Sequence, residues 1–269
     1  MYKLIALDMD GTLLKTDKTI SQETFNAIQS AKKKGIKVVL ATGRPVKGIK
    51  KYLTELNLLS DDDYAVAFNG AVVQTTKSEK IIAENLLSVD DIKTLYDLSK
   101  ELKVNIHALT NDECITPKIS KYSLLEAKMN SIPIKEIDFD NVNKDTTIVK
   151  IMFIDEEDIL DNAIKKIPKE FYDKYTVVKS SPYFLEFLNK KVNKGVGVKL
   201  LAEELGIDMK DIICVGDHEN DIDMVEYAGL GVAMENGIDK LKKVANFVTK
   251  SNDNDGVAYV INKFMLDKE

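Results

Sequence analysis

Short apolar runs and amphipathic stretches alternate along the first seventy residues of the chain. Leu4 to Leu7 is an unbroken apolar run, too short for a helix and typical of a strand that is covered on both faces. Ser21 can cap a helix that runs to Lys34, and Gly35 provides its left-handed end. Ile36–Leu40 and Tyr64–Phe68 read as the next strands, with a helix between them that Pro45 can open. This alternation of strands and helices predicts a doubly wound α/β core with a parallel sheet.

The middle of the chain has a different pattern. Strand-like pieces from Ala71 to Asn85 indicate a hairpin, and Ser88 can cap a helix that ends at Leu102. The remaining predicted elements are strands at Asn105–Leu109, Thr147–Ile154, Thr176–Lys179 and Phe184–Leu188 and a helix at Glu156–Ile167, with an irregular stretch between the first two strands. Glycine turns of the doubly wound kind are missing here. We therefore predict an inserted α+β cap domain at residues 84–190.

The first pattern returns at Lys194, where a helix begins that ends near Leu205. Further elements are predicted at Ile212–Val215, Asp221–Ala228, Leu230–Ala233, Ile238–Ala245, Phe247–Val248 and Asp255–Phe264. Residues 1–83 and 191–269 would thus form the two parts of one α/β core. The predicted fold is a doubly wound parallel-sheet core with an inserted α+β cap.

The composition limits the partners. The 269 residues are 44% hydrophobic, enough for a full core, and the net charge of −6 comes without a basic tract, which argues against nucleic acid. Cys114 and Cys214 are the two cysteines, too few for a disulfide framework. The N-terminus lacks a signal-peptide pattern, and apolar stretches fall short of the ~18 residues of a membrane span. We expect a cytoplasmic protein with a small soluble partner and no membrane, and the oligomeric state stays open.

Acids follow the first strand directly. Asp8 and Asp10 are one residue apart, and Gly11 allows a sharp exit of the chain. Acids held so close repel each other unless a cation or a shared proton relieves them, so they indicate a metal site or an acid/base pair. The other interpretation is a polar turn after a buried strand, and this stretch alone leaves both open.

Other strand ends add to this picture. Thr42, Gly43 and Arg44 offer a hydroxyl and free amides at a helix start, which suits an anion, although for Thr42 alone an ordinary strand-to-helix turn is the favoured interpretation. Asp217 follows another strand, and Lys194 begins a helix. Because parallel strands share one crevice at their carboxyl ends, these residues should meet. Carboxylates for a hard cation beside a lysine and amides for an anion suit phosphoryl transfer.

These residues resemble the motifs of the haloacid dehalogenase (HAD) superfamily of phosphatases. The matching stretches are Asp8-Met9-Asp10-Gly11-Thr12, Thr42-Gly43-Arg44, Lys194-Gly195 and Gly216-Asp217 with Asn220-Asp221. The insertion after the second motif, preceded by Asn69-Gly70-Ala71, resembles the Cof-type subfamily. Stretches such as Ser181-Pro182-Tyr183-Phe184-Leu185-Glu186 and Val192-Asn193-Lys194-Gly195 are similar to the YidA-like sugar phosphatases.

The resemblance implies catalytic roles. Asp8 would be the nucleophile that forms an aspartyl-phosphate. Asp10 would be the general acid and then the base, and a protonated Asp10 is reasonable because Asp8 disfavours a second negative charge. Mg²⁺ would be held by Asp8, the main-chain carbonyl of Asp10 and Asp217, and Asp221 would support this set of ligands from behind.

The resemblance also implies the groups that hold the substrate. The phosphoryl oxygens would be bound by Met9, Thr42, Gly43, Lys194 and Asn220. Candidate substrate contacts are Arg44, Asn69, Gly70, His107 and Glu186. For His107 a hydrogen-bonded structural role competes with substrate contact, and for Glu186 a surface carboxylate is the alternative.

The implied activity is a Mg²⁺-dependent phosphatase for small phosphorylated metabolites, with sugar phosphates as the expected class. A phosphosugar mutase with the same core and a non-catalytic phosphometabolite sensor are the alternatives. Retention of both Asp8 and Asp10 favours an enzyme over a sensor, because a pure binder does not need the second acid.

Overall fold

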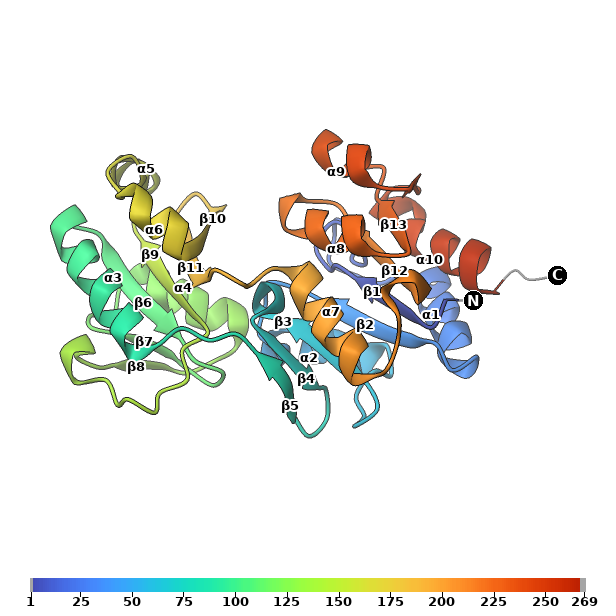
Figure 1. The fold of residues 1–269 in the computed structure, drawn as a ribbon, viewed down its shortest axis with the longest axis horizontal. Helices are drawn as coiled ribbons and strands as arrows, with labels where there is room; N and C mark the ends of the chain where they lie inside the picture. The colour runs from blue at the N-terminus through green and yellow to red at the C-terminus, as the bar shows by residue number, and fades with distance from the viewer. Residues whose placement is uncertain (1, 267–269) are drawn as a thin grey trace. The chain divides into compact units, whose positions relative to one another are not determined.

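The computed structural model describes residues 2–266, and the chain divides into two compact units. Unit 1 consists of the described residues up to Glu84 and from Asn193 onward, and unit 2 is Asn85–Val192. Figure 1 gives the labels of the helices and strands that are used below.

Unit 1 is built on a sheet with the strand order β14-β13-β12-β1-β2-β3-β4-β5. Its strands are β1 (Leu4–Leu7), β2 (Lys37–Ala41), β3 (Tyr64–Ala67), β4 (Val72–Thr75), β5 (Ile81–Glu84), β12 (Ile212–Gly216), β13 (Leu230–Ala233) and β14 (Phe247–Val248). The strands from β14 to β3 run parallel, and β4 and β5 add an antiparallel hairpin at one edge. The predicted parallel core and the edge hairpin are confirmed.

Helices cover both faces of this sheet. They are α1 (Gln22–Lys33), α2 (Val46–Glu55), α7 (Lys194–Glu204), α8 (Ile222–Tyr227), α9 (Asp239–Val244) and α10 (Gly256–Ile261), with short turns η1 (Phe68–Gly70), η3 (Met209–Asp211), η4 (Glu219–Asp221), η5 (Asn252–Asn254) and a π-helical turn η6 (Asn262–Leu266). The residues of β1 are fully buried although they point alternately to opposite faces. The apolar run Leu4–Leu7 therefore has the environment that its pattern predicts.

The helix starts of unit 1 follow local chemistry. Ser21 accepts a hydrogen bond from Thr24 N and caps α1, and Gly35 follows with φ +77°. Pro45 was expected inside the second helix, but it is the residue before α2, because its ψ of 156° is extended. The predicted closing helix is also divided, since α10 ends at Ile261 and η6 follows.

Unit 2 contains the sheet β10-β11-β9-β6-β7-β8, which is antiparallel except for β7 and β8. Its strands are β6 (Asn105–Leu109), β7 (Cys114–Thr116), β8 (Ile134–Glu136), β9 (Lys150–Ile154), β10 (Tyr175–Ser181) and β11 (Phe184–Asn189). Its helices are α3 (Val89–Leu102), α4 (Lys121–Asn130), α5 (Glu157–Ile164) and α6 (Lys169–Lys174), with η2 (Phe139–Asn141). The stretch expected to be irregular contains β7, α4 and β8, so that prediction was wrong.

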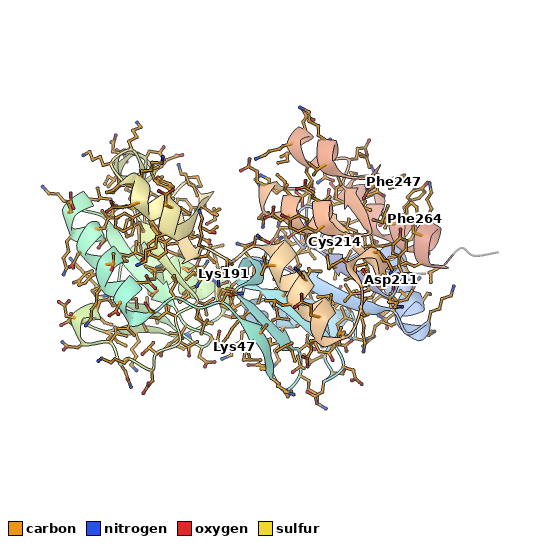
Figure 2. The ribbon with its side chains drawn as sticks, viewed as in Figure 1. Lys47, Lys191, Asp211, Cys214, Phe247 and Phe264 are labelled. Atoms are coloured by element: carbon orange, nitrogen blue, oxygen red, sulfur yellow. The ribbon has the colours of Figure 1, made fainter. Side chains whose placement is uncertain are left out.

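Cys214 lies in β12 within the core of unit 1 (Figure 2). In the same unit, the rings of Phe247 and Phe264 contact each other edge to face, with centroids 5.2 Å apart. Cys114 and Cys214 are both buried free thiols. Among the described residues, none of the helices combines the length and the apolar character that a membrane crossing requires.

The start of α3 is fixed by Asp91. Its carboxylate accepts hydrogen bonds from Ser88 N at 2.9 Å and from the Tyr175 hydroxyl at 2.6 Å, and Lys174 Nζ lies 2.7 Å away. Partial burial would raise the pKa of Asp91, but the hydrogen bonds from Lys174, Tyr175 and Ser88 outweigh this and lower it to about 2. The ionised carboxylate therefore stabilises the folded unit.

Asp91→Asn is expected to lower the free energy of unfolding of unit 2 by about 1 kcal/mol at pH 7. The unfolded carboxyl titrates near 3.9, and the folded pKa is lower. The stabilisation is therefore complete above the unfolded pKa and is lost as the pH falls toward 2. Urea unfolding at several pH values tests this, with the exposed Asp90→Asn as control. An equal difference between parent and Asp91→Asn at pH 7 and pH 3 would contradict the assignment.

Candidate functional site

The site lies at the carboxyl ends of β12, β1, β2 and β3, which are neighbours in the sheet of unit 1. Asp217 follows β12 and Asp8 follows β1. Thr42 follows β2, and the turn η1 follows β3. Topology therefore brings together residues that are more than two hundred positions apart in the sequence.

Asp8 and Lys194 form the buried centre of this site. The Lys194 side chain is fully buried, and its Nζ donates to Asp8 Oδ1 and, at 2.7 Å, to Asp221 Oδ1. Burial raises the pKa of Asp8 well above its ordinary value, and the charge of Asp221 adds to this effect, while Lys194 opposes it. Burial would lower the pKa of Lys194, but Asp221 and Asp8 outweigh this and raise it. The lysine is therefore a fixed cation beside Asp8.

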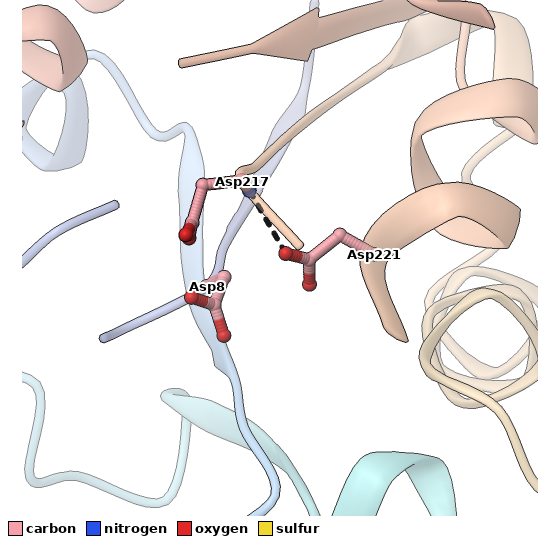
Figure 3. A group of neighbouring side chains, drawn as sticks. All are labelled: Asp8, Asp217 and Asp221. Atoms are coloured by element: carbon pink, nitrogen blue, oxygen red, sulfur yellow. Dashed lines mark hydrogen bonds between the residues drawn. The ribbon is translucent and has the colours of Figure 1, made fainter. Parts of the chain in front are cut away.

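Asp221 holds the loop after β12 in place. Its Oδ2 accepts from Asp217 N at 2.9 Å and from His218 N at 3.0 Å, and the first of these bonds is drawn in Figure 3. A Cβ at Gly216 would come within 2.4 Å of Asp221 Cβ, so only glycine lets the two segments approach this closely. Both oxygens of Asp221 are thus engaged by protein groups.

Asp217 faces Asp8 across a small gap (Figure 3). Thr12 Oγ1 donates to its Oδ1 at 2.8 Å, and a Cβ at Gly11 would come within 2.4 Å of its Oδ2. Burial raises the pKa of Asp217 and Asp221 adds to this, although the hydrogen bond from Thr12 lowers it. Negative charge in this site is therefore incompletely neutralised by the protein.

The residues present fit a divalent cation. One carboxylate oxygen from each of Asp8, Asp217 and Asp221 lies within 4.8 Å of the others. Hard cations such as Mg²⁺ take oxygen ligands, and positive charge here would oppose the burial and the Asp221 charge that together raise the pKa of Asp8 and of Asp217. Because Lys194 and main-chain amides engage both oxygens of Asp221, Asp8 and Asp217 are the carboxylates better suited to bind the metal.

The predicted anion-binding residues Thr42, Gly43 and Arg44 lie on the loop after β2. Thr42 is buried, and its Oγ1 accepts from Arg44 N at 3.2 Å. Asn69 N donates to Thr42 O at 2.9 Å, and its side-chain Oδ1 accepts from Asn220 Nδ2 at 3.0 Å. The hydrogen bonds thus link three of the strand ends.

Two further predicted residues shape the backbone here. Gly70 has φ +96°, and a Cβ there would come within 2.1 Å of the Asn193 carbonyl oxygen, just before Lys194. A Cβ at Gly43 would lie 3.2 Å from Asn69 Nδ2. Met9, between the two acids, has a fully buried side chain, so only its main chain could face a ligand.

Asp10 differs from expectation. Its carboxylate is bound by Arg44 Nη2 at 2.7 and 2.8 Å and by Lys18 Nζ at 2.8 Å. Partial burial would raise the pKa of Asp10, but the hydrogen bond from Lys18 and the charge of Arg44 outweigh it and lower the pKa below its ordinary value. The prediction that Asp8 keeps Asp10 protonated is therefore wrong for this conformation, because two cations compensate the second negative charge.

His107 and Glu186 lie within unit 2. His107 is fully buried on β6, its Nε2 lies 3.1 Å from Met152 Sδ, and burial together with the Lys150 charge lowers its pKa to about 3. Glu186 is 6% exposed and accepts from Lys150 Nζ at 3.1 Å, and Lys150 also pairs with Glu126 at 3.2 Å. The interpretation of Glu186 as a surface carboxylate, which the sequence left open, is therefore wrong.

Sequence reasoning missed several participants. Lys18 was not singled out, because an exposed loop lysine carries no local signal of its partner. Lys150 on β9 and Glu126 on α4 were missed for a different reason, since both are buried and their pairing depends on how α4 packs on the sheet. Thr12 was part of the first motif, but its bond to Asp217 joins positions 205 residues apart.

Known proteins resemble this chain over its whole length. A family model described as haloacid dehalogenase-like hydrolase matches residues 5–261. The Bacillus subtilis protein named "Putative phosphatase YxeH" is 44% identical over 270 residues, covering 100% of each chain. The 5-amino-6-(5-phospho-D-ribitylamino)uracil phosphatase YitU of Bacillus subtilis is 34% identical, covering 97% of each chain. The crystal structure of a haloacid dehalogenase-like hydrolase from Bacteroides thetaiotaomicron has a TM-score of 0.87 and 30% identity, covering 98% of this chain and 100% of that one.

Proposed function

Because the chain belongs to the Cof-type haloacid dehalogenase-like hydrolases, a family of phosphatases, we propose that it hydrolyses phosphate monoesters of small metabolites, with sugar phosphates as the substrate class. The observation that carries the proposal is the buried Asp8 carboxylate at a strand end, with Lys194 bonded to it and Asp217 beside it. A relative whose name gives a phospho-D-ribityl substrate supports the class. The closer similarity to YidA-like enzymes stays a prediction.

In the first proposed step, an Asp8 oxygen attacks phosphorus, the ester P–O bond breaks, and the leaving oxygen takes a proton from Asp10. In the second, water attacks phosphorus, its proton passes to Asp10, and the bond between phosphorus and the Asp8 oxygen breaks, which releases inorganic phosphate and the Asp8 carboxylate. Lys18 and Arg44 hold Asp10 as a carboxylate, so the first step requires Asp10 to leave them and take up a proton.

The remaining site residues would bind and orient the phosphoryl group. Lys194 would provide a point charge, and the amides of Met9 and Gly43, the Thr42 hydroxyl and Asn220 would donate hydrogen bonds to phosphoryl oxygens. Asp8, Asp217 and the Asp10 carbonyl would hold Mg²⁺, while Asp221 fixes the Asp217 loop. When bound, the ion supplies charge that neutralises the phosphoryl oxygens.

Unit 2 would select the alcohol part of the substrate, as a domain that excludes water and reads the leaving group. Arg44, Asn69 and Gly70 remain proposed substrate contacts. His107 and Glu186 are less suited to contact in this conformation, since both are buried and Glu186 is paired.

We also propose that the protein works in the cytoplasm without nucleic acid or a membrane. The buried free thiols Cys114 and Cys214 suit a reducing compartment, and the net charge of −6 disfavours polyanions.

The purified chain should release inorganic phosphate from sugar phosphates in a panel of phosphate esters with Mg²⁺. Excess chelator should abolish the release, and added Mg²⁺ should restore it, because the site offers only oxygen ligands. The measurement is phosphate release across the panel. Full turnover in chelator by metal-free protein would contradict the metal role, and an isomeric sugar phosphate accumulating without free phosphate would favour a mutase.

A further inference from the structure

The loop Gly11–Thr16, which follows Asp10, is held by side chains from the C-terminal part of unit 1. Asn236, after β13, donates from Nδ2 to the Gly11 carbonyl at 2.8 Å. Its Oδ1 accepts from Asn252 N at 3.0 Å, and Asn252 Nδ2 donates to the Leu14 carbonyl at 2.9 Å. Asp253 accepts from Thr16 N at 2.9 Å and from Thr16 Oγ1 at 2.7 Å. Asn236 therefore connects two loops and reaches the residue beside Asp10.

The loop that carries Asn236 also contacts the segment of Asp217. Ile238 N donates to the Asp217 carbonyl at 3.0 Å. A Cβ at Gly237 would lie 3.1 Å from that carbonyl oxygen and 3.2 Å from Asp217 Cα. One short loop, Met234–Ile238, is thus bonded to both segments that carry the proposed cation ligands.

Gly11 makes the conformation of the Asp10–Gly11 segment depend on its hydrogen bond with Asn236. Its φ is +88°, and as a glycine it has a wide choice of other backbone conformations. The Asp10 carbonyl belongs to the peptide that ends at Gly11 N, so a change in Gly11 conformation displaces that oxygen relative to Asp217. The Asn236 amide restrains this rotation by holding the Gly11 carbonyl.

We propose that Asn236 is a positioning residue that sets the separation between the Asp10–Gly11 peptide and Asp217 and thereby raises the affinity for a divalent cation. The inference rests on the proposed function, because it takes Asp8, the Asp10 carbonyl and Asp217 as the cation ligands. Asn236 would act on the cation through the Gly11 carbonyl that it binds. Groups that orient metal ligands are worth about 10–100-fold in metal affinity, and Asn236 acts one peptide further away, so we expect about 3–10-fold.

Asn236→Ala removes both side-chain bonds, and Asn236→Gln keeps a donor and an acceptor. Asn254→Ala is the matched control, because Asn254 is an exposed asparagine of the neighbouring turn η5, which carries Asn252, and its amide donates to Ser251 Oγ at 2.9 Å. Mn²⁺ binding is measured by electron paramagnetic resonance, beside the unfolding temperature of metal-free protein and KM for a phosphate ester at saturating Mg²⁺.

For Asn236→Ala we expect the Mn²⁺ Kd to rise about 3–10-fold, with KM and the metal-free unfolding temperature unchanged. Asn236→Gln should bind Mn²⁺ more tightly than Asn236→Ala, and Asn254→Ala should match the parent. An unchanged Kd, an equal loss in Asn254→Ala, or a lower unfolding temperature without a change in Kd would overturn the inference, as would a parent chain that binds no Mn²⁺. A parent that binds Mn²⁺ but hydrolyses no ester would contradict the proposed function, while the Kd values would still decide the role of Asn236.

Discussion

Asp8→Asn is expected to lower kcat by about 10⁴-fold or more, the scale seen when a catalytic nucleophile is removed. The amide has nearly the shape of the carboxylate but does not attack phosphorus. Phosphate release under saturating substrate and Mg²⁺ measures the effect. Asp17→Asn, an exposed acid on the following loop, is the control and should retain full activity.

The same substitution should leave the fold intact. Burial and Asp221 disfavour the charged form of Asp8, as its raised pKa indicates, so a neutral amide relieves repulsion even though it loses the Lys194 pair. The metal-free variant should therefore unfold at the parent's temperature or above. Substantial hydrolysis by a verified Asp8→Asn protein would exclude the aspartyl-phosphate route, and an unfolded variant would show that Asp8 has a structural role instead.

The core of unit 1 could be predicted from sequence because its signals are local. The apolar run Leu4–Leu7, the Ser21 cap and Gly35 each act within one turn or strand, and β13 and β14 have the predicted bounds. The rule that parallel strands share a crevice at their carboxyl ends then brings Asp8 and Asp217 to one edge. The order of the strands along that edge agrees with it.

The part of unit 2 between β6 and β9 could not be predicted in the same way. The strands β7 and β8 are three residues each, too short for a periodic pattern, and they exist because they pair with each other and with β6. Helix α4 did have a local signal in Ser120 as a cap and in the helix formers from Leu124 to Met129.

The ionic partners of the site side chains could not be predicted from sequence either. Sequence places Asp8 beside Asp10 and predicts repulsion, but the partners of Asp10 come from position 18 and from another strand end. Glu186 likewise stands alone among the apolar residues of β11, and its partner Lys150, which also pairs with Glu126 of α4, comes from another strand. Such charge pairs form across the fold, and spacing along the chain does not encode them.

Lys194→Ala is expected to lower both stability and activity, because it leaves the carboxylates of Asp8 and Asp221 buried without their shared cation. Removing one partner of a buried ion pair costs about 3–5 kcal/mol, so the free energy of unfolding of unit 1 should fall by this amount in metal-free protein. Lys199→Ala, on the exposed side of the same helix, should change it by less than about 0.5 kcal/mol. Denaturant unfolding of both variants measures the difference.

Activity provides the second readout for Lys194→Ala. If Lys194 binds the phosphoryl group, which all substrates share, kcat/KM should fall by a similar factor, about 10²-fold or more, for every ester that the parent hydrolyses. The panel is measured at a temperature where the variant is still folded, as circular dichroism verifies. A changed order of substrates would instead place Lys194 against the alcohol part, and a stability loss with unaltered kcat/KM would restrict the lysine to neutralising Asp8 and Asp221. The expected result is a uniform loss, because in the proposed role the Lys194 ammonium, which bonds Asp8, would face the phosphoryl group that all substrates share and not their variable part.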